Sequence, residues 1–140
     1  MMYLLDTNVC VAILNSDRGS VWARYDAASR RGVGLFVSSI TVFELEFGIA
    51  KSAGRRQAEN RARLGRLKGD PALRFLAFDG GDAAHAGRVR EHLRAAGRPI
   101  GPYDLLIAGQ ALARGLAVVT ANMGEFGRVP GLSVEDWSAA

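Results

Sequence analysis

The stretch YLLDTNVCVAIL, residues 3–14, places one acidic residue between two apolar segments. Tyr3–Leu5 has the length and composition of a short buried strand, and Thr7–Leu14 is apolar enough to form a helix that packs on a sheet. Asp6 stands at the junction, where an aspartate accepts hydrogen bonds from the first N–H groups of a helix. A strand that passes directly into a helix is typical of an α/β fold.

The same alternation continues along the chain. Further strands are predicted at Leu35–Val37, Leu73–Phe78, Leu116–Thr120 and Leu132–Val134. Further helices are predicted at Val21–Arg31, Ile40–Ala50, Arg55–Lys68, Ala83–Ala96 and Tyr103–Arg114, with Asp82 as the N-cap of the helix from Ala83 and a turn across Ser16–Ser20. We therefore predict a three-layer α/β/α sandwich around a mainly parallel sheet of about five strands, formed by a single domain over residues 1–140.

Composition narrows the class of protein. Hydrophobic residues make up 49% of the 140 residues, which is enough for a packed core. Cys10 is the only cysteine, so we expect no internal disulfide, no zinc site of the usual Cys/His type, and a reducing, cytoplasmic location. The first residues lack the features of a signal peptide, and no apolar run approaches the ~20 residues of a membrane span. We expect no membrane partner.

Two further acidic residues stand beside apolar segments. Glu44 lies within Thr41-Val42-Phe43-Glu44-Leu45, and Asp104 lies within Gly101-Pro102-Tyr103-Asp104-Leu105. In parallel α/β sheets, ligands bind beyond the carboxyl ends of the strands, where Asp6 and Thr120 are both expected. If Asp6, Glu44 and Asp104 converge there, their oxygens suit a hard divalent ion such as Mg²⁺ or Mn²⁺. Such a site activates water for phosphodiester hydrolysis.

Each of these carboxylates also has an explanation that needs no metal. Asp6 is placed to cap its helix. Glu44 matches a capping box with Thr41. Asp104 lies in a first helical turn, where a negative charge is favoured by the helix dipole. Only their shared position at one sheet edge favours the metal site.

The charge is +4, and arginine supplies most of the basic residues. Such a surface attracts a polyanion, although a solvated basic face is an equally good explanation for any single arginine. The basic residues gather on two predicted helices, as Arg55, Arg56, Arg61, Arg63, Arg66 and Lys68 on one and as Arg88, Arg90, Arg94 and Arg98 on or after the other. Phe43 and Phe47 have the spacing of core or interface residues, and His85 and His92 have that of surface or dimer contacts.

Four motifs, in this order and spacing, resemble those of PIN-domain nucleases, and the chain length and C-terminal segment look most like the VapC-type toxins. The motifs are Leu5-Asp6-Thr7-Asn8, Glu44-Leu45-x-x-Gly48, Gly101-Pro102-Tyr103-Asp104-Leu105-Leu106-Ile107-Ala108 and Val119-Thr120-Ala121-Asn122-x-x-Glu125-Phe126. The resemblance implies a PIN-like parallel sheet flanked by helices and a Mg²⁺-dependent endoribonuclease. It also implies a homodimer, either alone or in a heterotetramer or larger complex with a cognate antitoxin.

The resemblance also assigns roles to individual residues. Asp6, Glu44 and Asp104 match the catalytic metal ligands, with Mg²⁺ as the expected ion and Mn²⁺ as its substitute. The residues that would orient these carboxylates or complete the site are Thr7, Asn8, Thr120, Asn122 and Glu125. Many family members carry aspartate where this chain has Asn122, which leaves one metal and two metals as alternatives.

Two other functions stay open from the sequence. A haloacid-dehalogenase-type phosphatase also begins with a strand followed by aspartate, but its second aspartate would fall at Asn8, and neither Lys51 nor Lys68 has the matching context. A non-catalytic PIN module that only binds antitoxin is the other alternative, because Asn122 removes an acidic group.

Overall fold

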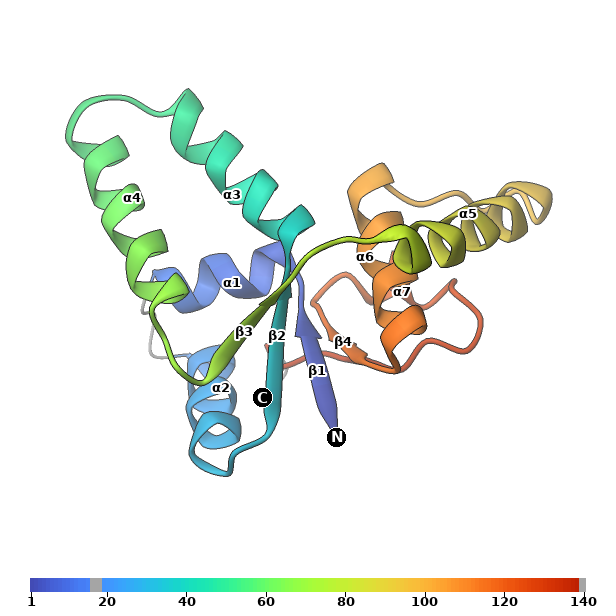
Figure 1. The fold of residues 1–140 in the computed structure, drawn as a ribbon, viewed down its shortest axis with the longest axis horizontal. Coiled ribbons are helices and arrows are strands. Elements are labelled where there is room, and N and C mark those ends of the chain that lie inside the picture. The colour runs from blue at the N-terminus through green and yellow to red at the C-terminus, as the bar shows by residue number, and fades with distance from the viewer. Residues whose placement is uncertain (16–18, 139–140) are drawn as a thin grey trace.

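A computed structural model describes residues 1–15 and 19–138 of the chain. Its centre is a five-stranded sheet with the order β3-β2-β1-β4-β5, and every neighbouring pair of strands is parallel (Figure 1). The strands are β1 (Met2–Leu5), β2 (Gly34–Ser38), β3 (Leu73–Leu76), β4 (Ala117–Val119) and β5 (Val134–Glu135). The predicted number of strands and their direction are therefore confirmed.

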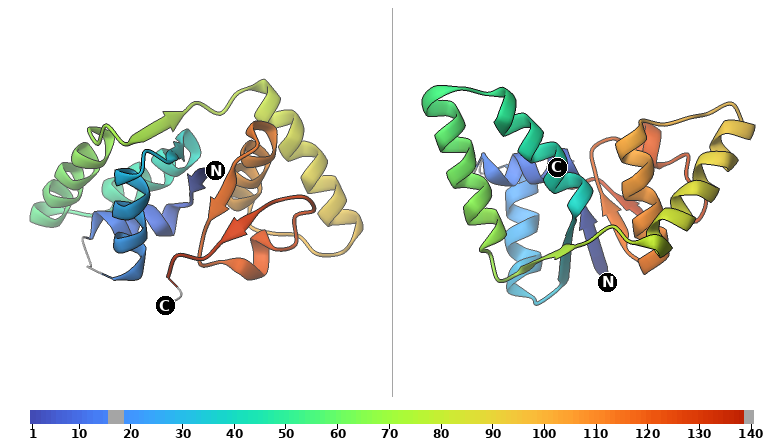
Figure 2. Two further views of the ribbon diagram at one scale, coloured as in Figure 1. Left: turned by 90° about the horizontal axis from the view of Figure 1, so that it is seen from below. Right: turned by 45° about the horizontal axis from the view of Figure 1, so that its top comes forward.

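Helices cover both faces of this sheet (Figures 1 and 2). One group consists of α1 (Thr7–Leu14), α2 (Ser20–Arg30), α3 (Ser39–Lys51) and α4 (Gly54–Lys68). The other consists of α5 (Gly80–Ala95), α6 (Pro102–Arg114) and α7 (Met123–Phe126). Each group contributes to its own cluster of buried side chains. The predicted three-layer α/β/α sandwich is confirmed.

The alternation of side chains along the central strands creates these two cores. Leu4 and Val118 pack with α5, α6 and α7, whereas Leu5 and Val119 pack with the four helices of the other group. Successive residues of a strand point to opposite faces, so two adjacent leucines serve different cores. Parallel strands covered on both faces need this nearly continuous apolar sequence.

Helices α5 and α6 pack closely through a glycine. A Cβ atom added at Gly109 would lie 2.5 Å from the Ala86 Cα atom and 2.7 Å from the Ala86 nitrogen. Because these are backbone atoms, no rotamer change can relieve the overlap. Gly109 therefore sets the distance between the two helices.

Replacing Gly109 with alanine should destabilise the protein by about 1–3 kcal/mol, the usual cost of overpacking a filled core. Gly87 on α5 is the matched control, because it is exposed and a Cβ there meets nothing within 4 Å. Gly87→Ala should leave stability unchanged or raise it by about 0.5–1 kcal/mol, since alanine favours the helix. Urea denaturation of both variants measures the difference, and equal midpoints would contradict the close-packing argument.

Some element boundaries differ from the predictions. Strand β3 ends at Leu76 rather than Phe78, and the last strand is Val134–Glu135 rather than Leu132–Val134. The turn predicted across Ser16–Ser20 lies partly outside the described residues. The short helix α7 was not predicted, because its four residues are too few to show a helical period.

The predicted N-cap of α5 was wrong. Asp79 is the N-cap, and its side chain accepts a hydrogen bond from the Asp82 N–H at 3.0 Å. Asp82 returns a bond to the Asp79 N–H at 2.9 Å, which completes a capping box. This reciprocal pair extends the helix back over Gly80 and Gly81, which by composition resemble a loop.

Candidate functional site

The candidate site lies where the strand order reverses. The chain runs from β1 outward to β2 and β3, and then returns to place β4 on the other side of β1. Asp6 directly follows β1 and Thr120 directly follows β4, and the Asp6 N–H donates to the Val119 carbonyl at 3.0 Å. In open α/β sheets, a crevice forms at the carboxyl ends of such strands.

Asp6 is a buried carboxylate, with 4% of its surface exposed. It is the N-cap of α1, as predicted, because its Oδ1 accepts the Val9 N–H at 2.9 Å. Burial raises the pKa of Asp6, hydrogen bonds from Thr120 and the backbone lower it, and the nearby charge of Glu44 raises it further. The hydrogen bonds that Asp6 accepts as a helix cap therefore do not offset its burial, and its pKa stays above the usual value.

Glu44 faces α1 from the second turn of α3. The Thr7 hydroxyl donates to Glu44 Oε1 at 2.6 Å, and the Thr7 and Thr41 hydroxyl oxygens lie 3.2 Å apart. The proposed capping box between Thr41 and Glu44 was wrong, because α3 begins at Ser39 and its N-cap is Ser38. Glu44 is thus free of a capping role, and a side chain next to Asp6 orients it.

Asp104 and Glu125 share one donor, the side-chain amide of Asn122. Asn122 Nδ2 donates to Asp104 Oδ2 at 3.2 Å and to Glu125 Oε2 at 2.5 Å. The Asn122 N–H donates to Thr120 Oγ1 at 2.9 Å, which connects this group to the end of β4. The other oxygen of Glu125 accepts the Gly101 N–H at 2.8 Å, in the loop that leads into α6.

The two carboxyls of this pair have opposite pKa shifts. Burial raises the pKa of Asp104 to about 6, together with the hydrogen bond and the charge of Glu125, and Asp6 and Glu44 raise it further. The Asn122 amide and the Gly101 N–H hold the pKa of Glu125 below its usual range. Of the two carboxyls, Asp104 is therefore the one that takes up a proton first as the pH falls.

The structure places most of the predicted residues in this arrangement. Thr7 is hydrogen-bonded to Glu44, Thr120 is hydrogen-bonded to Asp6, and Asn122 joins Asp104 to Glu125. The side chain of Asn8 is exposed, and only its backbone N–H reaches Asp6. The role of the Gly101 N–H was not predicted, since a backbone donor leaves no signal in the sequence.

The donor chemistry of the site fits a hard divalent cation. The site has four carboxylates, those of Asp6, Glu44, Asp104 and Glu125. In the described part of the chain, none of them lies within 4 Å of a basic group. The positive charge of Arg128 still lowers the pKa of Glu125 from a greater distance. Over the same residues, no three acidic, His or Cys side chains are already close enough to hold an ion. The carboxylate oxygens of Asp6, Glu44 and Asp104 are nevertheless of the type that a hard divalent cation prefers.

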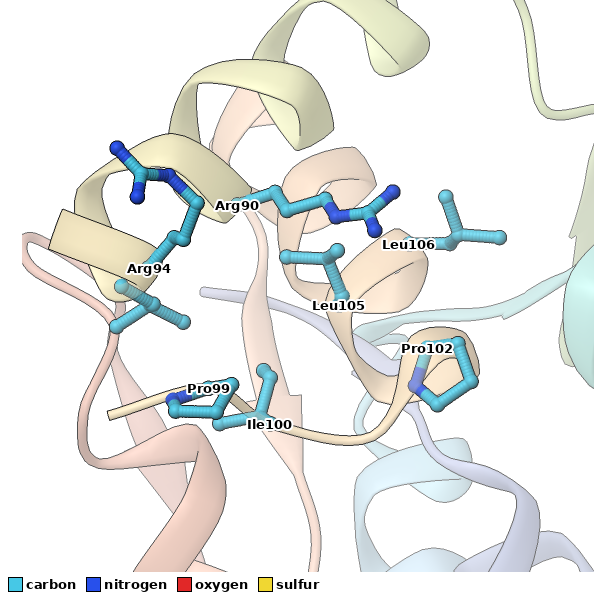
Figure 3. Close-up of a pocket in the computed structure, with 8 residues that line it drawn as sticks. Arg90, Arg94, Pro99, Ile100, Pro102, Leu105 and Leu106 are labelled. Carbon is cyan, nitrogen blue, oxygen red and sulfur yellow. The ribbon is translucent and has the colours of Figure 1, made fainter. Parts of the chain in front are cut away.

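A separate cavity of about 510 Å³ lies between α5 and α6. Figure 3 shows Arg90 and Arg94 of α5, Pro99 of the connecting loop, and Pro102, Leu105 and Leu106 of α6 around it. None of the four carboxylates lines this cavity. It is therefore distinct from the candidate site.

Among the described residues, no helix is both long and apolar enough to cross a bilayer.

Comparisons with known proteins agree with this geometry. The model of the PIN domain family matches residues 3–132. The tRNA(fMet)-specific endonuclease VapC of Salmonella typhimurium is 37% identical over 139 residues, which cover 98% of each chain. A crystal structure of VapBC2 from Rickettsia felis, bound to a DNA fragment from the VapBC2 promoter, contains a similar chain. The two chains have a TM-score of 0.88 and 32% sequence identity, and the match covers 98% of this chain and 99% of that one.

A further structure, VapBC-5 from Mycobacterium tuberculosis, is described as a member of the VapBC family of toxin–antitoxin systems. It has a TM-score of 0.67 and 27% identity, and the match covers 96% of both chains. The solved relatives of nearly equal length agree with the parallel sheet flanked by helices. The chain belongs to the PIN-domain family and, within it, to the VapC-type ribonucleases.

Proposed function

We propose that this protein is the toxin of a toxin–antitoxin pair, an endoribonuclease that needs a divalent metal to hydrolyse RNA phosphodiester bonds. One observation carries the proposal. Asp6, Glu44 and Asp104 come from three distant segments, act on each other electrostatically and have no basic partner within 4 Å among the described residues. Such a group is costly to assemble unless it binds a cation.

The proposed mechanism assigns a role to each side chain. Asp6, Glu44 and Asp104 would hold Mg²⁺, or Mn²⁺ in its place, and such an ion would acidify a water and polarise the phosphate when bound. Thr7 orients Glu44, and Asn122 orients Asp104 and Glu125. Both histidines lie on α5, so proton transfer is left to the carboxylates.

The proposed partners follow from the relatives. The Rickettsia felis and Mycobacterium tuberculosis structures are VapBC complexes, and the Salmonella protein is named for cleavage of an initiator tRNA. For this chain we propose a cognate antitoxin, an RNA substrate, and a homodimer that enters a heterotetramer or larger complex. We also propose that its 140 residues form a single nuclease domain that acts in the cytoplasm, where its unpaired Cys10 remains reduced.

Cleavage of total cellular RNA by the purified protein tests the activity. We expect discrete 5′ ends that appear with Mg²⁺ or Mn²⁺, disappear with EDTA and return when the metal is restored. End mapping then identifies the target. Intact RNA under every metal condition, from protein that binds its antitoxin, would instead show a non-catalytic module.

Metal binding should also stabilise the fold in a pH-dependent way. Because the folded pKa of Asp104 is about 6 and an unfolded aspartate titrates near 3.9, the metal-free protein should lose stability as the pH rises from ~4 through ~6. Protons and metal compete for this carboxyl, so Mg²⁺ or Mn²⁺ should raise Tm more at about pH 7.5 than at about pH 5. Differential scanning fluorimetry measures both effects. An equal metal-induced change in Tm at the two pH values would contradict Asp104 as a ligand.

A further inference from the structure

A groove of about 290 Å³ runs between α1, α3 and α4 and opens to solvent. Figure 1 shows α3 and α4 as two arms that rise beside α1. The groove is lined by Thr7, Val11, Leu14 and Asn15 of α1 and its end, by Glu44, Leu45, Gly48 and Ile49 of α3, and by Arg56, Asn60, Arg63 and Leu64 of α4. The volume lies just below the range for small-molecule sites, roughly 300–1,000 Å³.

One end of the groove is the candidate metal site itself. Thr7 and Glu44, joined by their 2.6 Å hydrogen bond, belong both to the groove and to the acidic site. A chain held at the acidic site can therefore continue into the groove without leaving the protein surface.

The floor of the groove is apolar and has space for a flat group. Val11 is 38% exposed, and Leu45 and Ile49 lie below it in the core. Gly48 lies on the same face of α3, and a Cβ added there would meet nothing within 4 Å. An aliphatic surface with no side chain projecting at its centre can pack against the flat apolar face of a nucleobase.

The α4 wall is basic and lacks acidic partners. Among the described residues, neither Arg56 nor Arg63 lies within 4 Å of a carboxylate, whereas Arg61 and Lys68 of the same helix both pair with Glu46. Arg56, Asn60 and Arg63 follow the helical spacing that places them on one face. The two arginines carry the charge that a phosphate needs, and Asn60 between them is a polar group able to bind a base edge.

We propose that this groove binds one single-stranded nucleotide of the RNA substrate, next to the phosphate that is cleaved. The inference rests on the proposed nuclease function. It also proposes that the enzyme selects the base next to the cleaved bond in this groove. The base lies on Val11 and over Gly48, Asn60 contacts its edge, and Arg56 and Arg63 bind the adjoining phosphates. A duplex does not fit, because its bases are stacked on one another and only its outer surface meets the protein.

Binding of a labelled random-sequence single-stranded RNA pool, measured by fluorescence anisotropy in EDTA, tests the arginines without cleavage. Each phosphate contact on single strands changes the slope of log K against log salt by about 0.7. The double variant Arg56→Gln/Arg63→Gln should therefore lower that slope by about 1.4, and the control Arg61→Gln should change it little because Arg61 is paired. An equal decrease in the salt slope for the double variant and for Arg61→Gln would refute the groove and indicate that RNA binds to a diffuse basic surface.

Blocking the floor tests the base site. Gly48→Leu adds a side chain into open space on a helix, so it should fold, occupy the space of the base and raise KM for RNA cleavage several-fold. Gly65→Leu is the control, since Gly65 is exposed on α4 and outside the groove. Asn60→Ala should change which base is found beside the mapped cleavage ends.

The two proposals fail in different ways. If the unaltered protein cleaves no RNA with any metal, the nuclease function fails. If it cleaves RNA but the Gly48→Leu, Asn60→Ala and double-arginine variants keep its KM, cleavage ends and salt slope, only the nucleotide groove fails. In the second case, weaker binding of an antitoxin by the same variants would assign the groove to a protein segment instead.

Discussion

The Asp104→Asn variant should cleave RNA at least about a thousandfold more slowly than the unaltered protein. A metal contributes several kcal/mol to the transition state, and each ~1.4 kcal/mol is a factor of ten in rate. The amide has nearly the same shape as the carboxyl but no charge with which to hold a cation. Single-turnover cleavage of a mapped RNA substrate measures the loss.

Stability distinguishes this effect from misfolding. In the metal-free protein, Asp104 is disfavoured as an anion by burial and by Glu125. The neutral amide should therefore leave Tm unchanged or raise it above pH 6, while the gain in Tm from Mg²⁺ or Mn²⁺ disappears. Glu91→Gln is the control, because this exposed carboxylate on α5 pairs with Arg94 and lies outside the candidate site. Full cleavage by Asp104→Asn would refute the proposed metal site.

Replacing Asp82 with alanine should produce the largest loss of stability, about 3 kcal/mol. Asp82 is 1% exposed and accepts hydrogen bonds from Arg114, from Gln110 Nε2 at 3.0 Å and from the Asp79 N–H. Removing one partner of a buried ion pair costs roughly 3–5 kcal/mol, and the lower end applies because Arg114 is partly exposed. Urea unfolding measures the change.

The matched control for this variant is Asp26→Ala. Asp26 also pairs with an arginine, Arg30, but both side chains are largely exposed, so the loss should be below about 1 kcal/mol. Equal losses for the two variants would refute the structural role of the Asp82 network.

The pH dependence of the Asp82 contribution has the opposite sign to that of Asp104. Burial alone would raise the pKa of Asp82, but hydrogen bonds from Arg114, Asp79 and Gln110 outweigh it and hold the pKa below its usual value. A lowered folded pKa gives stability that is present above pH ~4 and is lost as the pH falls through the folded value. The difference in stability between the unaltered protein and Asp82→Ala should shrink only in that acidic range.

Much of the fold could be predicted because buried parallel strands leave a strong pattern. Leu4 and Leu5, followed by an aspartate that caps a helix, give the central strand and its direction. The reversal of strand order then puts Asp6 and Thr120 at one edge, which general topology predicts. The N-cap of α5 was missed because Asp79 and Asp82, three residues apart, are equally good caps by composition.

The fine structure of the site could not be predicted from the sequence. Thr41 and Glu44 have the spacing of a capping box, and only tertiary packing shows that Thr7 is the partner of Glu44. Asn122 could be identified as a departure from the acidic pattern. That its one amide binds two carboxylates from different helices depends on the position of α7, which has no periodic signal.

The central position of β1 has a consequence for synthesis of the protein. Its neighbour β4 lies more than a hundred residues later, and Asp104, Asn122 and Glu125 also come from the last third of the chain. A nascent chain on the ribosome carries Asp6 and Glu44 long before their partners have been translated. The proposed metal site, which joins Asp6 and Glu44 to Asp104, can therefore be assembled only when the chain is nearly finished.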